Sequence, residues 1–154
     1  MSRRKQIELG QDEVIALMAE NYVAVVSSNG RRGWPHSMPL WYVERDGEVW
    51  AWTFGKSQKV KNLERDNRAT ALIEAGDSYA ELRGVMVEAE TVIHRDPDVV
   101  GAFAAELGVR YADRIGVDVD TARDVFAPQV PKRVALQFKP VRTASWDHRK
   151  LTAS

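Results

Sequence analysis

The stretch WPHSMPLWYVERDGEVWAWTFGKSQKVKNL, residues 34–63, decides the fold because its periodicity changes from that of strands to that of a helix. Side chains alternate between two faces from Trp34 to Val43 and again from Glu48 to Thr53, with the turn dipeptide Asp46-Gly47 between them. This spacing predicts a hairpin of two antiparallel strands that carries four tryptophans.

A cationic turn follows the hairpin. Ser57 is placed to cap a short helix through Leu63. Free backbone N–H groups at the helix start, the hydroxyls of Thr53 and Ser57, and the ammonium groups of Lys56 and Lys59 all favour a phosphate there. A capped surface helix with solvated lysines explains the same residues, so both interpretations stay open.

The phosphate loop of nucleotide hydrolases also ends in Gly-Lys-Ser, as residues 55–57 do. Its first glycine would fall on Trp50, so the spacing excludes that motif.

Length and composition favour one domain over residues 1–154, with 22 basic and 22 acidic residues and no cysteine. The balanced charge gives no indication of nucleic acid as a partner. No run approaches the roughly 20 apolar residues of a membrane span, and no apolar run follows the basic N-terminus. We expect a soluble, cytoplasmic protein with no disulfide and no cysteine-bound metal.

The rest of the chain predicts further strands with helices at the periphery. Amphipathic patterns predict helices over residues 11–21, 96–107 and 120–126. β-Branched or alternating runs predict strands over residues 22–28, 68–75, 80–94 and 132–145. Asn67 is expected to end the cationic helix in the left-handed conformation, and Gly84 to mark a bulge or bend.

Tight turns join most of these strands, which favours antiparallel pairing over a doubly wound parallel sheet with crossover helices. The fold class predicted is therefore mainly β, of the α+β type, with about six antiparallel strands closed into a barrel and helices at its edges.

The titratable residues do not form a recognisable catalytic motif. The histidines are His36, His94 and His148, and none lies in a metal-ligand spacing. A hydrogen-bonded structural histidine is the simpler interpretation of His36. No Ser/His/Asp order or HExxH stretch occurs, so any chemistry would come from a bound cofactor.

The run from PHSMPLWYV (residues 35–43) through TFGKSQKVKNLERD (53–66) to ATALIEA (69–75) resembles the split-barrel flavin and deazaflavin oxidoreductases, relatives of pyridoxamine 5'-phosphate oxidase. The tail SWDHRKL (145–151) is similar to the ending of the branch that often uses coenzyme F420. The resemblance covers essentially the whole chain, and the pattern from Thr53 to Leu63 is its most specific part. Asn67 departs from it, since the family often has proline there.

The resemblance implies an FMN-binding type of split barrel, and a homodimer that holds the cofactor between its subunits. The cofactor expected is F420, with FMN as the alternative. Thr53, Ser57 and Lys59 match the positions that hold its phosphate, Asn62 supports that turn, and residues 36–41 match the strand along the ring. The cofactor-binding residues expected are His36, Ser37, Met38, Pro39, Trp41, Thr53, Lys56, Ser57, Gln58, Lys59 and Asn62, with no metal ligand.

The activity that the resemblance favours is hydride transfer from reduced F420 to an electron-poor small molecule, with no side chain as an obligatory acid or base. An FMN-dependent oxidoreductase of the same fold, a non-catalytic cofactor-binding protein and an empty barrel are the alternatives. Pyridoxamine phosphate oxidation itself is disfavoured, because the ending RKLTAS (149–154) is not similar to that enzyme's. The crowded tryptophans are expected at the dimer interface. Positive charge for the F420 tail is expected from Arg31, Arg32, Lys56, Lys61 and Arg65.

Overall fold

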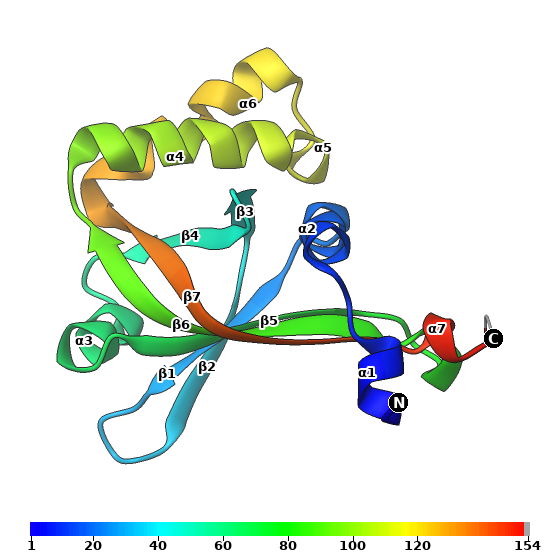
Figure 1. Ribbon diagram of the computed structural model, residues 1–154. Helices are drawn as coiled ribbons and strands as arrows, with labels where there is room; N and C mark the ends of the chain where they lie inside the picture. Colours follow the sequence, from blue (N-terminus) through cyan, green and yellow to red (C-terminus); the bar gives the residue numbers. More distant parts are fainter. Residues whose placement is uncertain (153–154) are drawn as a thin grey trace.

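The computed structural model describes residues 1–152, which fold into a curled antiparallel sheet with helices along its rim (Figure 1). The strands are β1 (Ala24–Asn29), β2 (Pro35–Leu40), β3 (Tyr42–Arg45), β4 (Glu48–Phe54), β5 (Arg68–Ala75), β6 (Arg83–His94) and β7 (Arg133–Asp147). The α-helices are α1 (Arg3–Ile7), α2 (Gln11–Glu20), α3 (Gln58–Arg65), α4 (Pro97–Arg110), α5 (Ala112–Ile115), α6 (Val119–Val125) and α7 (Arg149–Thr152). Short 3-10 helices span Tyr79–Glu81 and Ala127–Lys132.

The strand order is β2-β1-β5-β6-β7-β4-β3, and every pair is antiparallel. This confirms the split-barrel architecture, with seven strands where about six were expected. The extra strand arises because residues 34–43 do not form one strand. Residues 35–40 pair with β1, whereas residues 42–45 pair with β4, and the chain changes partner at Trp41. The turn at Asp46-Gly47 is confirmed, with φ of 52° and 83°.

Side chains from the helical layer fix this change of partner. The Trp41 ring stacks on Tyr111 at 4.3 Å between centroids. The Tyr111 hydroxyl accepts a hydrogen bond from the Tyr42 backbone N–H at 2.9 Å and donates to the Tyr22 carbonyl at 2.7 Å. Arg110 donates to the Tyr42 carbonyl at 2.9 Å. Burial raises the pKa of Tyr111, so its hydroxyl remains a proton donor at neutral pH.

Two apolar clusters form the core. One fills the inside of the curled sheet. The other lies between the β3–β4 hairpin and α4, which runs along the top of the sheet in Figure 1. Trp41, Trp50 and Trp52 belong to this second cluster. The ring centroid of Trp52 lies 6.1 Å from that of Phe103 and 5.6 Å from that of Phe126. Helices of the same chain cover these three tryptophans, so they do not require a subunit interface, whereas Trp34 at the start of the hairpin is 72% exposed.

Two backbone predictions were wrong. Asn67 does not adopt the left-handed conformation, and Asp46 is the only non-glycine residue with positive φ in the described part of the chain. Instead, the Asn67 carbonyl accepts from the Thr91 N–H at 2.8 Å, which ties the end of α3 to β6. Gly84 lies in a regular part of β6, and the irregularity falls between residues 88 and 89. A Cβ at Gly84 would lie 2.5 Å from the Trp146 ring, so glycine is needed there for packing.

The predicted helices and strands exist, with shifted ends. Helix α4 continues through Gly108 to Arg110, because Gly108 packs against the Ala122 carbonyl of α6, where a Cβ would lie only 2.0 Å away. Strand β7 extends two residues beyond its predicted end, to Asp147, so part of the polar tail belongs to the sheet.

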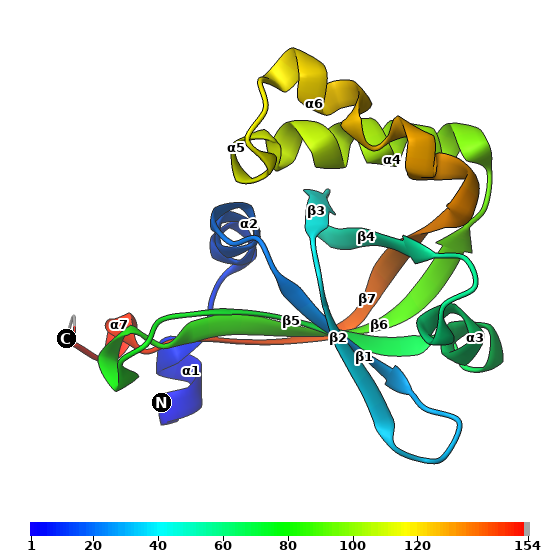
Figure 2. The same cartoon turned by 180° about the vertical axis from the view of Figure 1, so that it is seen from behind.

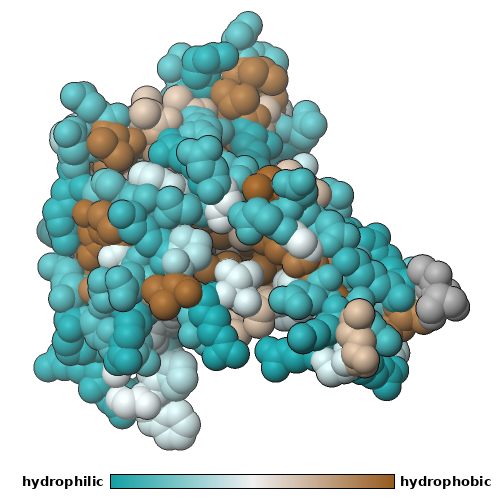
Figure 3. Space-filling model, viewed as in Figure 1, coloured by the Kyte–Doolittle hydropathy of each residue, from teal (hydrophilic) through white to brown (hydrophobic). Residues whose placement is uncertain are grey.

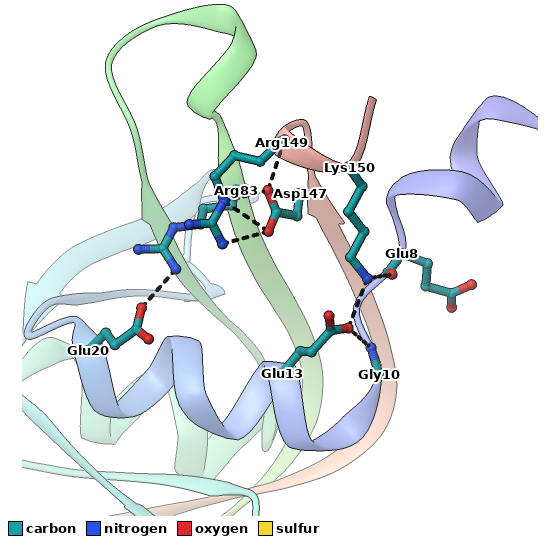
Figure 4. Close-up of polar contacts among 8 residues, drawn as sticks. All are labelled: Glu8, Gly10, Glu13, Glu20, Arg83, Asp147, Arg149 and Lys150. Carbon is teal, nitrogen blue, oxygen red and sulfur yellow. Dashed lines mark hydrogen bonds and ion pairs between the residues drawn. The ribbon is translucent and has the colours of Figure 1, made fainter. Parts of the chain in front are cut away.

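An ionic cluster joins the two ends of the chain (Figure 4). The buried Asp147 carboxylate accepts three hydrogen bonds from the Arg149 guanidinium, at 2.7, 3.0 and 3.2 Å. The Lys150 ammonium donates to Glu13 at 2.9 Å, and the same Glu13 oxygen accepts from the Gly10 N–H at 2.7 Å. These contacts hold the start of α2 against the end of β7.

Asp147→Asn should weaken the fold in a pH-dependent way. Hydrogen bonds from Arg149 hold the pKa of Asp147 below its ordinary value. The ionised group therefore stabilises the fold above an unfolded pKa of about 3.9, and this contribution is lost as pH falls through the lower folded pKa. We expect a loss of about 1 to 2 kcal/mol in the free energy of unfolding at neutral pH, measured by urea denaturation.

The control is Asp77→Asn, which changes an exposed carboxylate. It should leave the free energy of unfolding unchanged within about 0.5 kcal/mol. The difference between wild type and Asp147→Asn should shrink on acidification. A difference that stays constant from neutral to acidic pH would contradict the ionic origin.

Candidate functional site

The site begins where β4 passes into α3. The predicted N-cap is confirmed, because the Ser57 hydroxyl accepts from the Val60 N–H at 3.4 Å. The Thr53 hydroxyl, buried at the end of β4, donates to the Ser57 hydroxyl at 3.4 Å. Two hydroxyls and the first free N–H groups of an eight-residue helix therefore lie together. This is an arrangement that favours an anion.

Lys59 is the most informative residue in this region. Its side chain is only 8% exposed, and within residues 1–152 it forms no hydrogen bond or ion pair. Burial, and secondly the charge of Arg133, lower the pKa of Lys59. A cation that is partly desolvated and has no counter-ion is unfavourable, and a nearby anion would relieve that cost.

Arg133, at the start of β7, is half-buried against the end of β4. Its guanidinium carbon lies 3.8 Å from the Phe54 ring centroid and 4.9 Å from that of Trp52. Its hydrogen bonds go to the neutral Gln129 side chain, at 2.7 and 3.2 Å. Arg133 thus adds positive charge near Lys59 and brings no counter-ion.

On another side of α3 lies a pocket of about 330 Å³. The figures place α3 beside the β1–β2 hairpin in both views (Figure 2). The pocket is lined by the turn between these strands, the start of β2 and one face of α3, namely Gly30, Arg31, Arg32, Trp34, Pro35, His36, Gln58 and Asn62. The fold therefore brings together three of the predicted residues, His36, Gln58 and Asn62.

Hydrogen bonds fix the α3 wall of this pocket. Gln58 donates to the Asn62 side-chain oxygen at 2.9 Å, and Asn62 donates to the Ser28 hydroxyl on β1 at 3.3 Å. Asn62 is fully buried and ties α3 to β1, and its role in supporting the cofactor's turn stays a prediction. Ser28 lies opposite His36 in the sheet register, which aligns α3 with β2.

His36 does not have the full hydrogen bonding expected of a structural histidine. Its Nδ1 atom is buried and has no partner. A buried polar atom without a partner is unfavourable and is a reason to look for a ligand. This orphaned nitrogen and the unpaired Lys59 are the two observations that fit a bound polar cofactor.

The other predicted residues do not all reach this pocket. Strand alternation sends Ser37 and Pro39 to the opposite face from His36, and the Ser37 hydroxyl pairs with that of Ser27 at 2.8 Å. Met38 shares the His36 face and is 41% exposed. Trp41 lies away from the pocket, stacked on Tyr111 in the second apolar cluster. Lys56 is exposed beside the Ser57 cap.

Sequence reasoning on the cofactor site did not include Trp34 or Arg133, and it considered Arg31 and Arg32 only for their charge. Arg31, Arg32 and Trp34 follow one another in the β1–β2 turn, and Arg133 starts the last strand. The two arginines shortly before an aromatic residue were a sequence signal that the β1–β2 turn contributes to the ligand site. The position of Arg133 depends on β7 pairing with β4, which local patterns do not indicate.

A larger hollow of about 430 Å³ crosses β1, β5, β6 and β7 and shares Pro35 with the first pocket. It lies on the sheet beside the Ser27 and Thr70 side chains. There is thus room for a second molecule next to the residues already described.

Comparison with known proteins identifies the family. A sequence model described as pyridoxamine 5'-phosphate oxidase matches residues 11–147. The chain belongs to this family. No curated protein matches the chain in sequence.

Solved structures of family-like proteins agree with the fold. Conserved hypothetical protein Rv2991 from Mycobacterium tuberculosis is 34% identical, with a TM-score of 0.88 over 99% of this chain and 93% of that one. An F420 reductase is 18% identical, with a TM-score of 0.63 over 83% and 93%. A FAD-binding protein from Mesorhizobium loti is 15% identical, with a TM-score of 0.61 over 89% and 92%. At such low identity, the last two show the fold alone.

The described residues contain no group of three or more His, Cys, Asp or Glu side chains suited to a metal ion. Within the same residues, no helix is long and apolar enough to cross a membrane.

Lys59→Met should stabilise the ligand-free protein and weaken cofactor binding. Removing a partly desolvated charge that has no counter-ion should raise the Tm. Losing a charge-assisted phosphate contact should cost about 1.5 to 3 kcal/mol, or roughly ten- to hundredfold in affinity. Thermal unfolding and calorimetric titration with F420 and FMN measure the two effects.

Lys139→Met, which changes an exposed lysine of β7, is the control and should alter neither quantity. The pKa of Lys59 is lower in the folded state than in the unfolded state, where it is about 10.4. As pH rises toward that value, Lys59 loses its proton in the folded state first, and the cost of its charge disappears. The Tm difference between Lys59→Met and the wild type should therefore shrink as pH approaches about 10.4. A lower Tm with unchanged dissociation constants would make Lys59 a purely structural residue.

Proposed function

We propose that this protein binds a phosphate-bearing flavin or deazaflavin at the start of α3, and that the cofactor is F420. The observation that carries the proposal is the buried, unpaired Lys59 beside the Ser57 cap. A phosphate would give Lys59 a counter-ion and would accept hydrogen bonds from the helix start. Membership of the pyridoxamine 5'-phosphate oxidase family is consistent with such a ligand.

The roles of the chain's residues follow from their positions. Ser57, Thr53 and Lys59 would hold the phosphate, while Gln58 and the buried Asn62 keep α3 against β1. His36 and Met38 lie on the exposed inner face of β2, where a ring could lie along the strand. F420 in its reduced form supplies a hydride. The chain then has to bind, orient and shield the reactants, and no side chain has to act as an acid or base.

The choice of F420 over FMN rests on charge beyond the phosphate position. F420 continues past its phosphate into an acidic tail, whereas FMN ends there. Arg31 and Arg32 line the pocket beside α3, are exposed, and form no ion pair within residues 1–152. Lys61 is also exposed on α3. Arg65 is less available, because it donates to the Asn29 carbonyl at 2.6 Å.

The substrate in this proposal is an electron-poor organic molecule that approaches through the larger hollow next to Pro35. A protein that binds F420 without catalysing hydride transfer is the non-enzymatic alternative. Single-turnover oxidation of bound reduced F420 by a panel of electron-poor acceptors distinguishes the two. Loss of the cofactor's reduced spectrum with any acceptor supports the enzyme, and no change with all of them supports a binding protein.

The double variant Arg31→Ala/Arg32→Ala should weaken F420 binding and leave FMN binding nearly unchanged. Each exposed contact is worth about 0.2 to 1 kcal/mol, so the double variant should lose roughly two- to thirtyfold in F420 affinity. The wild type should bind F420 more tightly than FMN at low salt, and this preference should shrink as salt rises. Titration calorimetry of both proteins with both cofactors at two salt concentrations measures the eight dissociation constants.

Arg3→Ala/Arg4→Ala removes the same charge from the exposed face of α1 and serves as the matched control. It should leave F420 affinity within about twofold of the wild type. FMN binding as tight as that of F420 at low salt would contradict the F420 assignment and support an FMN-dependent protein. Binding of neither cofactor would contradict the proposal as a whole.

We also propose a homodimer with the cofactor between subunits. Apolar side chains remain on the outer sheet surface, including Val25, Leu72 and the exposed Val141, which border hollows there. Figure 3 shows one face of the molecule, which is largely hydrophilic with separate hydrophobic patches. Trp41, Trp50 and Trp52 are covered within the chain and do not support the dimer, so the interface would use this sheet surface instead.

Sedimentation at micromolar concentration should give twice the mass of the chain. Val141→Glu should shift the protein toward monomer, because it places a charge in an apolar contact. The exposed Val119→Glu on α6 is the control. A wild-type monomer at these concentrations would contradict the dimer.

A further inference from the structure

The turn between β1 and β2 is rigidly built. The Gly33 N–H donates to the Gly30 carbonyl at 3.1 Å, and the Gly30 N–H donates to the Trp34 carbonyl at 3.0 Å. Gly33 has φ of 83°, and a Cβ on Gly30 would lie only 2.2 Å from the Trp34 oxygen. The backbone of this turn is therefore fixed without a ligand, and it presents Arg31, Arg32 and Trp34 next to α3.

Trp34 is unusual among the five tryptophans of the chain. Its side chain is 72% exposed, whereas the other four are buried or half-buried. Leaving so large an aromatic ring in water forfeits about 2 kcal/mol or more of burial free energy. The position is also a wall of the 330 Å³ pocket and not an isolated surface site.

Three side chains of the pocket region lie in one row. Trp34, His36 and Met38 alternate onto the same face, and opposite this row on β1 are the buried Val26 and Ser28. The row thus continues the inner, apolar face of the sheet out to its edge, and it includes the buried Nδ1 atom of His36 that has no partner. Apolar side chains that flank one unpaired polar atom, His36 Nδ1, fit a planar ring with hydrogen-bonding groups better than they fit water.

Charge points to the same kind of occupant. The guanidinium groups of Arg31 and Arg32 lie in the same turn, and neither has a carboxylate partner within residues 1–152. A ligand that joins an aromatic ring to anionic groups would pack its ring against the row of Trp34, His36 and Met38. Its anionic groups would neutralise the two arginines. A purely apolar partner would leave the two charges uncompensated.

We infer that Trp34 contacts the planar ring of the bound cofactor and makes the β1–β2 turn a specificity element of the pocket. This rests on the proposed function and extends it to a residue outside the cofactor-binding set predicted from the sequence. Trp34 contributes aromatic contact area, while Arg31 and Arg32 supply charge. The turn therefore selects ligands that have both a ring and an anionic group.

The test combines affinity with solvent access. Calorimetric titration of Trp34→Ala with F420 and FMN should show about a tenfold loss of affinity for the cofactor that the wild type binds, and Trp34→Phe should retain most of it. In the wild type, the bound cofactor should protect part of the tryptophan emission from acrylamide, a neutral quencher. This protection should be absent in Trp34→Phe.

Tyr79→Ala is the matched control, because it removes another exposed aromatic ring, 64% exposed, far along the chain from the turn. It should leave affinity unchanged. Thermal unfolding of each variant verifies that the fold is retained, as expected for side chains so exposed.

Three results would overturn the inference, and they can be told apart. Unchanged cofactor affinity in Trp34→Ala would remove Trp34 from the pocket and leave the proposed function intact. Shielding of Trp34 from acrylamide in the ligand-free protein would make it a subunit contact. Failure of the wild type to bind either cofactor would refute the proposed function itself.

Discussion

The change of strand partner at Trp41 is the constraint on which the rest of the structure depends. Strand β2 stays with β1, while β3 pairs with β4 at the other edge of the sheet. Tyr111 and Arg110, from the end of α4, hold the crossing point through hydrogen bonds to Tyr42. Because the two edges diverge, the inner face of β2 has no facing strand. His36 and Met38 on that face, and Trp34 just before the strand, stay accessible beside α3.

The start of α3 shows how local stability and ligand binding oppose each other. The Ser57 cap and the apolar positions of the helix stabilise it locally. Lys59 works against this stability, since the residue is only 8% exposed, has no counter-ion within residues 1–152, and lies close to the charge of Arg133. A ligand that supplies a counter-ion would compensate this cost, which is why Lys59 carries more functional information than the exposed Lys56.

Local signals predicted much of the fold. The turn at Asp46-Gly47, the cap at Ser57 and most strands follow from short-range patterns. The partner exchange at Trp41 could not be predicted, because alternation is the same on both sides of it and pairing is a long-range choice. The covering of Trp41, Trp50 and Trp52 could not be predicted either, because it depends on how α4 docks. For the site, the sequence indicated the residues of α3. It did not indicate that His36 and the turn from Arg31 to Trp34 lie beside them, because that closeness arises only on folding.

The central claim is that the β4–α3 junction holds the phosphate of a flavin-type cofactor. A crystal structure of the protein with bound F420, or with FMN if that binds more tightly, tests this most directly. The phosphate should lie within hydrogen-bond distance of the Ser57 hydroxyl and the Lys59 ammonium, with Trp34 and His36 contacting the rest of the ligand. A cofactor bound elsewhere, or a phosphate away from α3 with Lys59 still unpaired, would contradict the account.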